Sequence, residues 1–222
     1  MEDDVWNWLS QHTQLLSLPI KVGTFLVWWG FMQMLLNSYL RQRSAKLVIN
    51  RGSGRGINAI CVVSNMSQEP VFIEALIGVL ETSEGRYTFD LTDFTDKNRS
   101  KDTQELSSEE LELRQVTRQG PLSQGQYVQF GSFRELIEGV TEHNGIAIDS
   151  RCIPKEGINF NSFELRLIAL YGPEDNLIGA MRRFHLNRNN NGDYELAPRK
   201  RTKQFDSRRK QKKVCQWIKD MA

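Results

Sequence analysis

The spacing of apolar residues changes near Lys46 of this 222-residue chain. Before that point the apolar residues form one long run, and Val22 to Leu40 contains no charged side chain. At the helical rise of about 1.5 Å per residue, this run would be about 28 Å long, which is close to the hydrocarbon thickness of a bilayer. The pattern predicts a transmembrane helix over residues 21–41. The alternative is a buried core helix of a soluble protein.

The charges that flank this run predict its orientation. Arg41, Arg43 and Lys46 follow it, whereas the amino side carries a single lysine and an acidic start. Because cytoplasmic flanks carry the excess of Lys and Arg, we expect the N-terminus outside and the main domain in the cytoplasm. The acidic start is unlike the basic beginning of a cleaved signal peptide, so we expect a retained anchor. Residues 1–20 are expected to form an extracytoplasmic or interfacial segment that Pro19 separates from the span.

Small and amide residues recur on one side of the predicted span. Gly23, Gly30 and Asn37 are seven residues apart, and Gln33 lies three past Gly30. Such a stripe permits close backbone approach and hydrogen bonds between helices. It predicts a helix–helix contact and a homo-oligomer formed through the span. The alternative is that the two amides reach the lipid headgroups.

From Lys46 onward, short runs of branched and aromatic residues alternate with turn residues. This pattern is typical of strands joined by hairpins. We predict seven strands, within residues 46–50, 57–65, 70–81, 85–91, 125–131, 163–172 and 177–186. Seven short strands predict a mainly β domain over residues 46–197, with the architecture of an antiparallel β-sandwich.

Two segments interrupt the strands. Residues 95–119 are polar and charged, and they predict either a solvated connector or a short helix capped at Ser107 or Ser108. In the segment from Ser132 to Gly145, the apolar residues fall at helical spacing. This second segment predicts a short helix packed on one edge of the sandwich.

The segment from Val62 to Leu91, "VVSNMSQEPVFIEALIGVLETSEGRYTFDL", places polar turns between three predicted strands. It resembles the immunoglobulin-like domain of small bacterial proteins that join one amino-terminal membrane span to such a domain. The resemblance implies an immunoglobulin-like fold and a location in the bacterial inner membrane. It brings no catalytic residues with it.

The net charge of +2 hides a strongly basic tail over residues 198–222. Ten Lys or Arg and two Asp lie between Arg199 and Ala222. Val214, Trp217 and Ile218 have helical spacing, so we predict a basic amphipathic helix that starts near Asp206 or Ser207. Such helices bind anionic lipid. The predicted lipid contacts are Arg41, Arg43, Lys46, Arg208, Arg209, Lys210, Lys212, Lys213 and Trp217.

The same pattern is compatible with two other partners for this tail, the domain itself and nucleic acid. The helix could instead pack its apolar stripe on the domain and leave its charges in solvent. Nucleic acid would also attract the positive charge, but the tail lacks the interleaved aromatic residues that stack on bases. We therefore expect no nucleic-acid partner.

The candidates for chemistry are few. The loop from Asn50 to Asn58 contains G-x-G-x-G, but a strand-like segment follows where a phosphate loop needs a helix. Cys152, His143 and Asp149 could form a nucleophilic site if the fold brings them together. The three cysteines include no CxxC pair, which favours a reducing compartment, and no histidine has metal-ligand spacing. We expect no cofactor and no metal.

These patterns predict a single-span membrane protein whose cytoplasmic β-sandwich is a non-enzymatic interaction or scaffolding module for a protein partner. One alternative is a membrane effector whose span oligomerises and perturbs the bilayer on a cytoplasmic signal. Another is a hydrolase that uses Cys152 and His143.

Overall fold

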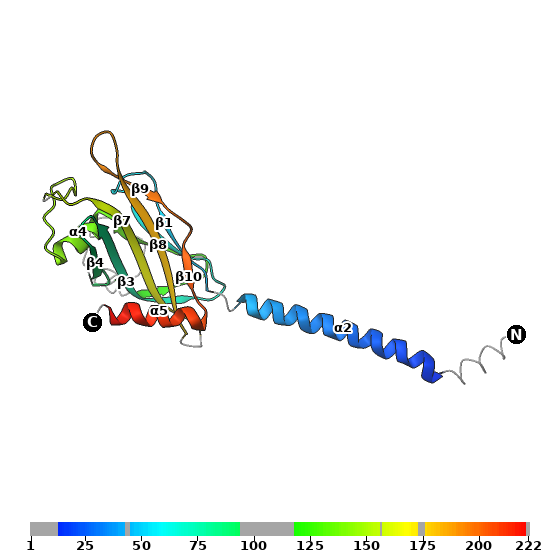
Figure 1. Ribbon diagram of the computed structural model, residues 1–222. Coiled ribbons are helices and arrows are strands. Elements are labelled where there is room, and N and C mark those ends of the chain that lie inside the picture. Colours follow the sequence, from blue (N-terminus) through cyan, green and yellow to red (C-terminus); the bar gives the residue numbers. More distant parts are fainter. Residues whose placement is uncertain (1–12, 43–44, 94–117, 156, 173–175, 221–222) are drawn as a thin grey trace, which may run out of the picture. The chain divides into compact units, whose positions relative to one another are not determined.

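The computed structural model describes residues 13–42, 45–93, 118–155, 157–172 and 176–220. The chain forms two compact units, which divide between Ser44 and Ala45. The first unit contains helix α2, and the second contains all the strands that the structure describes (Figure 1).

Helix α2 (Thr13–Gln42) is a continuous helix of 30 residues. Its large apolar side chains are exposed, and Trp28 and Met34 are each 70% exposed. Pro19 lies inside the helix, so our prediction that it separates an interfacial segment from the span is wrong. A proline removes one backbone donor, and this loss does not end a helix of this length.

The predicted transmembrane helix over residues 21–41 is part of α2. Among the helices that the structure describes, none has both the length and the mean hydropathy of a membrane-crossing helix. The amides Gln33 and Asn37 lower the mean hydropathy of α2, because amide groups are costly to remove from water.

The second unit is mainly β and contains two antiparallel sheets. The smaller sheet has the order β1-β2-β6, with β1 at Leu47–Arg51, β2 at Ile60–Asn65 and β6 at Tyr127–Ser132. The larger sheet has the order β10-β8-β7-β3-β4, with β5 paired to β3 and β9 paired to β8. Its strands are β3 (Val71–Thr82), β4 (Arg86–Asp90), β5 (Gly120–Leu122), β7 (Phe160–Tyr171), β8 (Asn176–Arg188), β9 (Tyr194–Pro198) and β10 (Lys203–Phe205).

The main hydrophobic core lies between the two sheets, and helix α4 (Phe133–His143) packs against it. Ser132 begins this helix with a capping box, in which Glu135 N–H donates to Ser132 Oγ at 3.2 Å and Ser132 N–H donates to Glu135 Oε2 at 2.9 Å. Phe133 and Val140 are among the residues that α4 buries. The predicted helix in this segment is confirmed.

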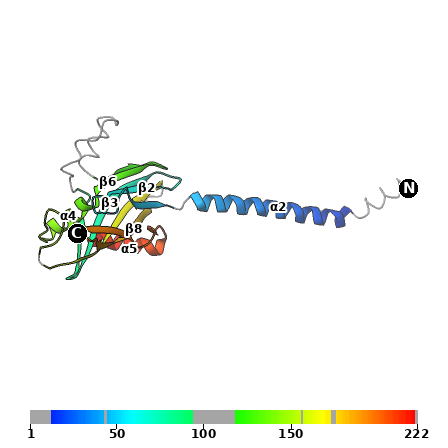
Figure 2. The same ribbon diagram turned by 90° about the horizontal axis from the view of Figure 1, so that it is seen from above.

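Helix α5 (Arg208–Lys219) covers part of the outer face of the larger sheet. Val214 and Trp217 of α5 are buried against this face, together with Phe205 of β10. Gly179 of β8 permits the close approach, because a Cβ there would lie 2.7 Å from Val214 Cγ2 and 2.9 Å from Trp217 Cζ3. Figure 2 shows β2 and β6 on the opposite side of β3 and β8 from α5, so the domain has three layers.

Side chains of β10, of the preceding residue Thr202 and of β8 join β1 to the larger sheet, and we call this row of bonds the β1–β10 seam. Leu47 N–H donates to Gln204 Oε1 at 3.2 Å, and Gln204 Nε2 donates to the Leu47 carbonyl. Ile49 N–H donates to Thr202 Oγ1 at 3.0 Å, and Arg182 Nη1 donates to the Ile49 carbonyl. These bonds satisfy backbone groups that an edge strand would otherwise leave unpaired.

The strand predictions agree with the structure for β1, β2, β3, β4, β6, β7 and β8. All seven predicted segments contain strands, and the short strand β5 lies at Gly120–Leu122, where no strand was predicted. The strands β9 and β10 were missed as well. The predicted helix at Ser107 or Ser108 lies outside the described residues.

Candidate functional site

The part of the outer sheet face that α5 leaves open is polar. Residues two apart on a strand share a face, so β7 presents Glu164 and Arg166 together. The strand register places Arg183 of β8 opposite Glu164, and it places Arg86 of β4 opposite Glu81 of β3. Charged residues from four strands therefore meet beside α5.

Glu164 is the centre of this group, which we call the Glu164 cluster, and its side chain is only 3% exposed. Its Oε1 accepts hydrogen bonds from Arg166 Nε at 2.8 Å and from Arg86 Nη2 at 3.1 Å. Its Oε2 accepts from Arg183 Nε at 3.0 Å and from Arg183 Nη2 at 2.8 Å. Arg183 Nη1 donates in addition to Glu81 Oε2 at 3.2 Å. One buried carboxylate thus holds three guanidinium groups.

The arginines keep Glu164 ionised. Burial acts to raise the pKa of Glu164, but hydrogen bonds from Arg183 and Arg166 outweigh burial, and the pKa lies below its ordinary value. The hydrogen bond to Glu164 also raises the pKa of Arg183. The Glu164 carboxyl is therefore ionised at neutral pH.

A cavity of about 370 Å³ lies between the Glu164 cluster and α5. Arg166 borders it, with its guanidinium carbon 5.0 Å from the centre of the Trp217 ring. This geometry is that of a cation–π contact. The residues that line the cavity are Arg86, Glu164, Arg166, Met181, Arg183, Lys213, Gln216, Trp217 and Asp220.

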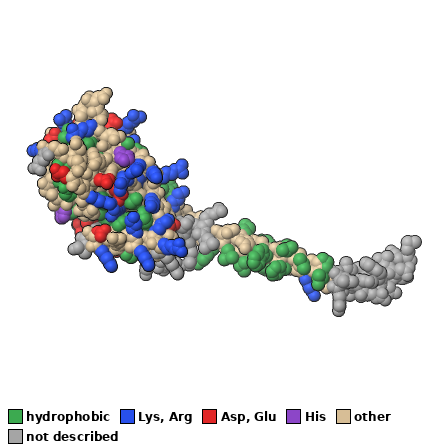
Figure 3. Space-filling model, viewed as in Figure 1, with side chains coloured by type: hydrophobic (Ala, Val, Ile, Leu, Met, Phe, Trp, Pro, Cys, Tyr) green, Lys and Arg blue, Asp and Glu red, His purple; other side chains and the backbone are tan. Residues whose placement is uncertain are grey.

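The basic side chains of α5 lie on its solvent side. Arg209, Lys210, Lys212 and Lys213 are exposed, and Lys and Arg side chains gather over α5 and the neighbouring strands in Figure 3. The side chain of Arg208 lies outside the described residues. Trp217 is 2% exposed, which corrects our prediction that it contacts lipid. Its ring is in contact with the sheet and is unavailable to a membrane while α5 stays docked.

The predicted contact residues on and beside α2 that the structure describes are exposed. Gly23, Gly30, Gln33 and Asn37 are exposed, and a Cβ added at either glycine would meet no atom within 4 Å. Of the predicted lipid contacts near the helix end, Lys46 is exposed. Arg43 and the side chain of Arg41 lie outside the described residues.

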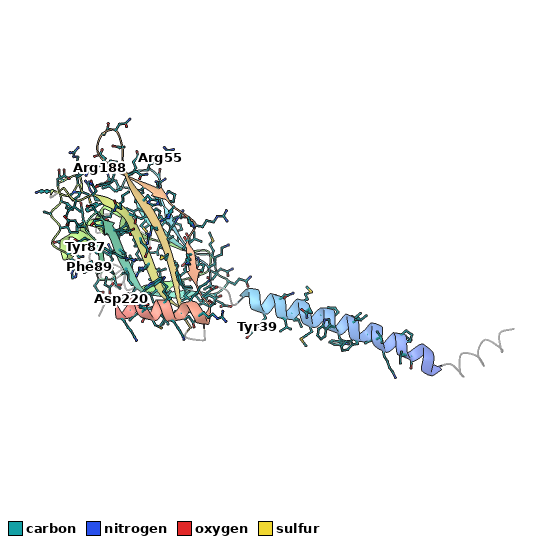
Figure 4. All side chains as sticks on the ribbon, in the orientation of Figure 1. Tyr39, Arg55, Tyr87, Phe89, Arg188 and Asp220 are labelled. Atoms are coloured by element: carbon teal, nitrogen blue, oxygen red, sulfur yellow. The ribbon has the colours of Figure 1, made fainter. Side chains whose placement is uncertain are left out.

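The structure does not assemble Cys152 and His143 into a nucleophilic pair. Burial raises the pKa of the Cys152 thiol to about 12, and the negative charge of Glu138 acts in the same direction. His143 is exposed and stacks on Phe89 with the ring centres 4.1 Å apart; Figure 4 labels Phe89 on β4. No hydrogen bond joins Cys152 to His143 in the part of the chain that the structure describes. A thiol with so high a pKa is a weak nucleophile at neutral pH.

The glycine-rich loop joins two strands, as its sequence predicts. Gly52 N–H donates to the Ile60 carbonyl at 2.8 Å, so the loop connects β1 to β2. Arg51 Nη1 donates to the Leu196 carbonyl of β9. No helix follows the loop within the described residues up to Asp93, so this loop lacks the helix that a phosphate loop needs.

Sequence reasoning missed the Glu164 cluster. The signal was present in β7, where Ser162, Glu164 and Arg166 alternate with apolar residues inside a strand that otherwise looks fully buried. A charged pair at alternate positions of such a strand indicates an outer face with its own polar partners. The partners themselves, Arg86 and Arg183, come from other strands and depend on their pairing.

Comparison with known proteins gives no relative for this chain. No family model, curated protein or solved structure matches it. The candidate site is therefore interpreted from its geometry, and the resemblance to bacterial single-span proteins stays a prediction.

Proposed function

We propose that the chain is a membrane-anchored, non-enzymatic binding module, in which α2 associates with the bilayer and the β domain meets a protein partner. The observation that carries this proposal is the exposed apolar surface of α2. Fourteen of its large apolar side chains are exposed, from Leu18 to Tyr39, and they lie on all sides of the helix. Lipid would cover such a surface, which is far larger than the isolated apolar residues of ordinary protein surfaces.

The placement of charges supports a cytoplasmic β domain. Val22 to Leu40 carries no charged residue, and positive residues follow it. Cys61, Cys152 and Cys215 form no disulfide, which suits a reducing compartment. We retain the immunoglobulin-like assignment of the sandwich and the bacterial inner membrane as parts of this proposal.

The basic face of α5 gives the anchored domain a second contact with lipid. Lysine and arginine near an anionic membrane surface contribute about 1 kcal/mol each to binding. The exposed residues Arg209, Lys210, Lys212 and Lys213 are available for this contact without undocking α5. Tethering by α2 would raise the effective concentration of this face at the membrane.

Membrane fractionation tests the proposal. The full chain is expected to sediment with membranes and to resist extraction at alkaline pH. The double variant Leu26→Lys and Met32→Lys should move it to the supernatant, because each charge would enter the apolar surface of α2. The matched control, Met66→Lys and Tyr127→Lys, adds the same charges at exposed apolar residues of the β domain and should leave the chain on the membrane. A wild-type chain found in the supernatant would refute anchoring.

A reporter fused to the C-terminus tests the orientation. An enzyme that is active only outside the cytoplasm should stay inactive in this fusion, since the positive flank is expected on the cytoplasmic side. Activity of the reporter would place the β domain outside and contradict this part of the proposal.

A further inference from the structure

The cavity beside the Glu164 cluster has more positive than negative charge. Four of its lining residues are cations, Arg86, Arg166, Arg183 and Lys213, and two are carboxylates. This leaves a surplus of two positive charges around a space that is partly removed from solvent. Such a surplus attracts an anion, and most strongly a dianion.

Part of this positive charge has no protein partner. Arg166 donates to Glu164 through Nε, and its Nη1 and Nη2 make no hydrogen bond to any residue that the structure describes. Lys213 forms no ion pair with a described residue. Because Glu164 fixes the Nε edge of the Arg166 guanidinium, its two terminal nitrogens are held in a planar fork, which is the geometry that binds two oxygens of a phosphate.

The size of the cavity adds a second constraint. A volume of about 370 Å³ is well above the space that a bare ion needs. It lies near the lower end of pockets that hold small molecules, which range from about 300 to 1,000 Å³. Met181 and Trp217 supply apolar surface beside the charged groups. The cavity therefore has room for an organic group attached to the anion.

Besides Glu164, whose charge is paired with arginines, one carboxylate of the cavity opposes an anion. Asp220 lies at the C-terminal end of α5, as Figure 4 shows, and its side chain makes no ion pair with a described residue. Its negative charge lowers the attraction for an anion at that end of the cavity. This makes Asp220 useful in a test, because its removal should strengthen binding.

We propose that this cavity binds the phosphate monoester group of a small ligand, with Arg166 and Lys213 as the residues that contact it. A phosphate monoester carries a charge of about −1.5 to −2 at pH 7, which matches the surplus of the lining residues, whereas a carboxylate carries a single charge. This inference names a ligand class for the proposed binding module and rests on that function. It requires only the β domain, and it does not depend on membrane anchoring.

The first experiment measures binding of adenosine monophosphate to the full chain in a non-ionic detergent by titration calorimetry. Saturable binding is expected, and acetate at the same concentration should not compete. Lys213→Gln should weaken binding about fivefold, as expected for one exposed charge. Lys212→Gln is the matched control, because it removes the same charge from the next residue of α5, which does not line the cavity.

Two further variants test the geometry. Arg166→Lys keeps the charge beside Glu164 but removes the planar fork, so we expect about tenfold weaker binding. Asp220→Asn should strengthen binding about twofold to fivefold, since it removes a repelling charge at an exposed position. A merely structural ion-pair network would give no such strengthening.

The source of the phosphate is distinguished with vesicles of phosphatidylcholine that contain either phosphatidic acid or phosphatidylglycerol. Only phosphatidic acid carries a phosphate monoester. If its vesicles bind the wild type better than the Lys213→Gln variant, and phosphatidylglycerol vesicles do not discriminate, the ligand is a lipid headgroup. If only adenosine monophosphate discriminates, the ligand is a soluble phosphate.

The outcomes separate the two proposals. The cavity proposal is overturned if no probe binds, or if Lys213→Gln and Lys212→Gln weaken binding equally. A chain that fails to sediment with membranes but binds phosphate in the expected order of variants loses its proposed anchor and keeps its ligand site. A chain that sediments with membranes but binds no probe loses the ligand site alone.

Discussion

Helices α2 and α5 both carry apolar residues, but their sequences place them differently. In α5 the apolar residues form one stripe, and Val214 and Trp217 of that stripe are buried on the larger sheet. In α2 apolar residues surround the helix, and Trp28 stays 70% exposed. An apolar stripe can be buried by one complementary surface, and the outer face of the larger sheet provides that surface for α5. A helix that is apolar on all sides needs a surrounding apolar medium or several partners, and the described part of the chain supplies neither.

Replacing a tryptophan in each helix tests this comparison most strongly. Trp217→Ala should lower the free energy of unfolding of the β domain by about 3–5 kcal/mol, because it removes a buried ring that packs on Phe205 and Gly179. Trp28→Ala should change it by less than about 0.5 kcal/mol. Urea unfolding of the full chain in detergent, followed by circular dichroism, measures both. A small loss for Trp217→Ala would mean that α5 is not stably docked.

The charged group beside α5 should have the next largest effect. Glu164→Gln should lower the free energy of unfolding at pH 7 by about 2–3 kcal/mol, since three arginines lose a buried counter-charge. Folding lowers the pKa of Glu164, so its stabilisation is complete above the unfolded-state value of about 4.3 and is lost as the pH falls toward the folded-state value.

Urea unfolding at several pH values checks this second prediction. The difference between the wild type and Glu164→Gln should shrink below about pH 4.3. Glu84→Gln, in the exposed turn between β3 and β4, is the matched control and should have little effect at any pH. A difference between the wild type and Glu164→Gln that stays constant with pH would contradict the role of the carboxylate charge.

A smaller change tests the fit between α5 and the sheet. Gly179→Ala should cost about 1–2 kcal/mol in stability, because its Cβ would lie 2.7 Å from Val214 and 2.9 Å from Trp217. Gly85→Ala serves as the control, since a Cβ there meets no atom within 4 Å. Equal unfolding midpoints for the two variants would show that α5 adjusts without cost.

The smallest predicted effect concerns α2. If the stripe of Gly23, Gly30, Gln33 and Asn37 joins two copies of the chain, Gln33→Leu with Asn37→Leu should weaken the association about fivefold, because two interhelical hydrogen bonds are lost. Crosslinking in detergent over a dilution series measures it. Met32→Leu with Leu35→Met changes the opposite side of the helix and should leave the association unchanged.

The same pair of variants examines the membrane-effector alternative. Growth arrest on induction that disappears with Gln33→Leu and Asn37→Leu would support an effector. Harmless expression of the wild type would favour the binding module.

The long elements of the β domain could be predicted from the sequence because each has a local pattern. Alternating or continuous apolar runs marked the long strands, and Ser132 with helical spacing marked α4. The strands β5 and β10 have only three residues each, as in Lys203–Phe205, and so short a segment contains too little alternation to be recognised. The strand β9 (Tyr194–Pro198) is as long as β1 and β4, but it contains no β-branched residue and ends in proline, so its strand pattern is weaker. Their strand character comes from their pairing with β3 and β8.

The candidate site was beyond prediction for a related reason. Arg86 and Glu164 are separated by 78 residues in the chain and meet only because β3 pairs with both β4 and β7. In the tail, the sequence predicted the helix but not the surface on which it packs. The spacing of Val214 and Trp217 predicted an amphipathic helix correctly, but an apolar stripe suits lipid and protein surfaces alike. Gly179, whose missing side chain lets α5 pack closely on the sheet, lies about 35 residues before Val214 in the sequence, so the tail pattern alone does not reveal this contact.

The β1–β10 seam also has a mechanical consequence. The chain passes from α2 into β1 within a few residues, so a pull on α2 would act first on Lys46, whose N–H donates to Ser67 Oγ and whose carbonyl accepts from Met66 N–H, and then on Leu47. That strand is held by five residue pairs with β2 on one side and by the side chains of Thr202 and Gln204 on the other. A force applied to α2 would therefore be shared between both sheets, and the residues that precede α5 would bear part of it.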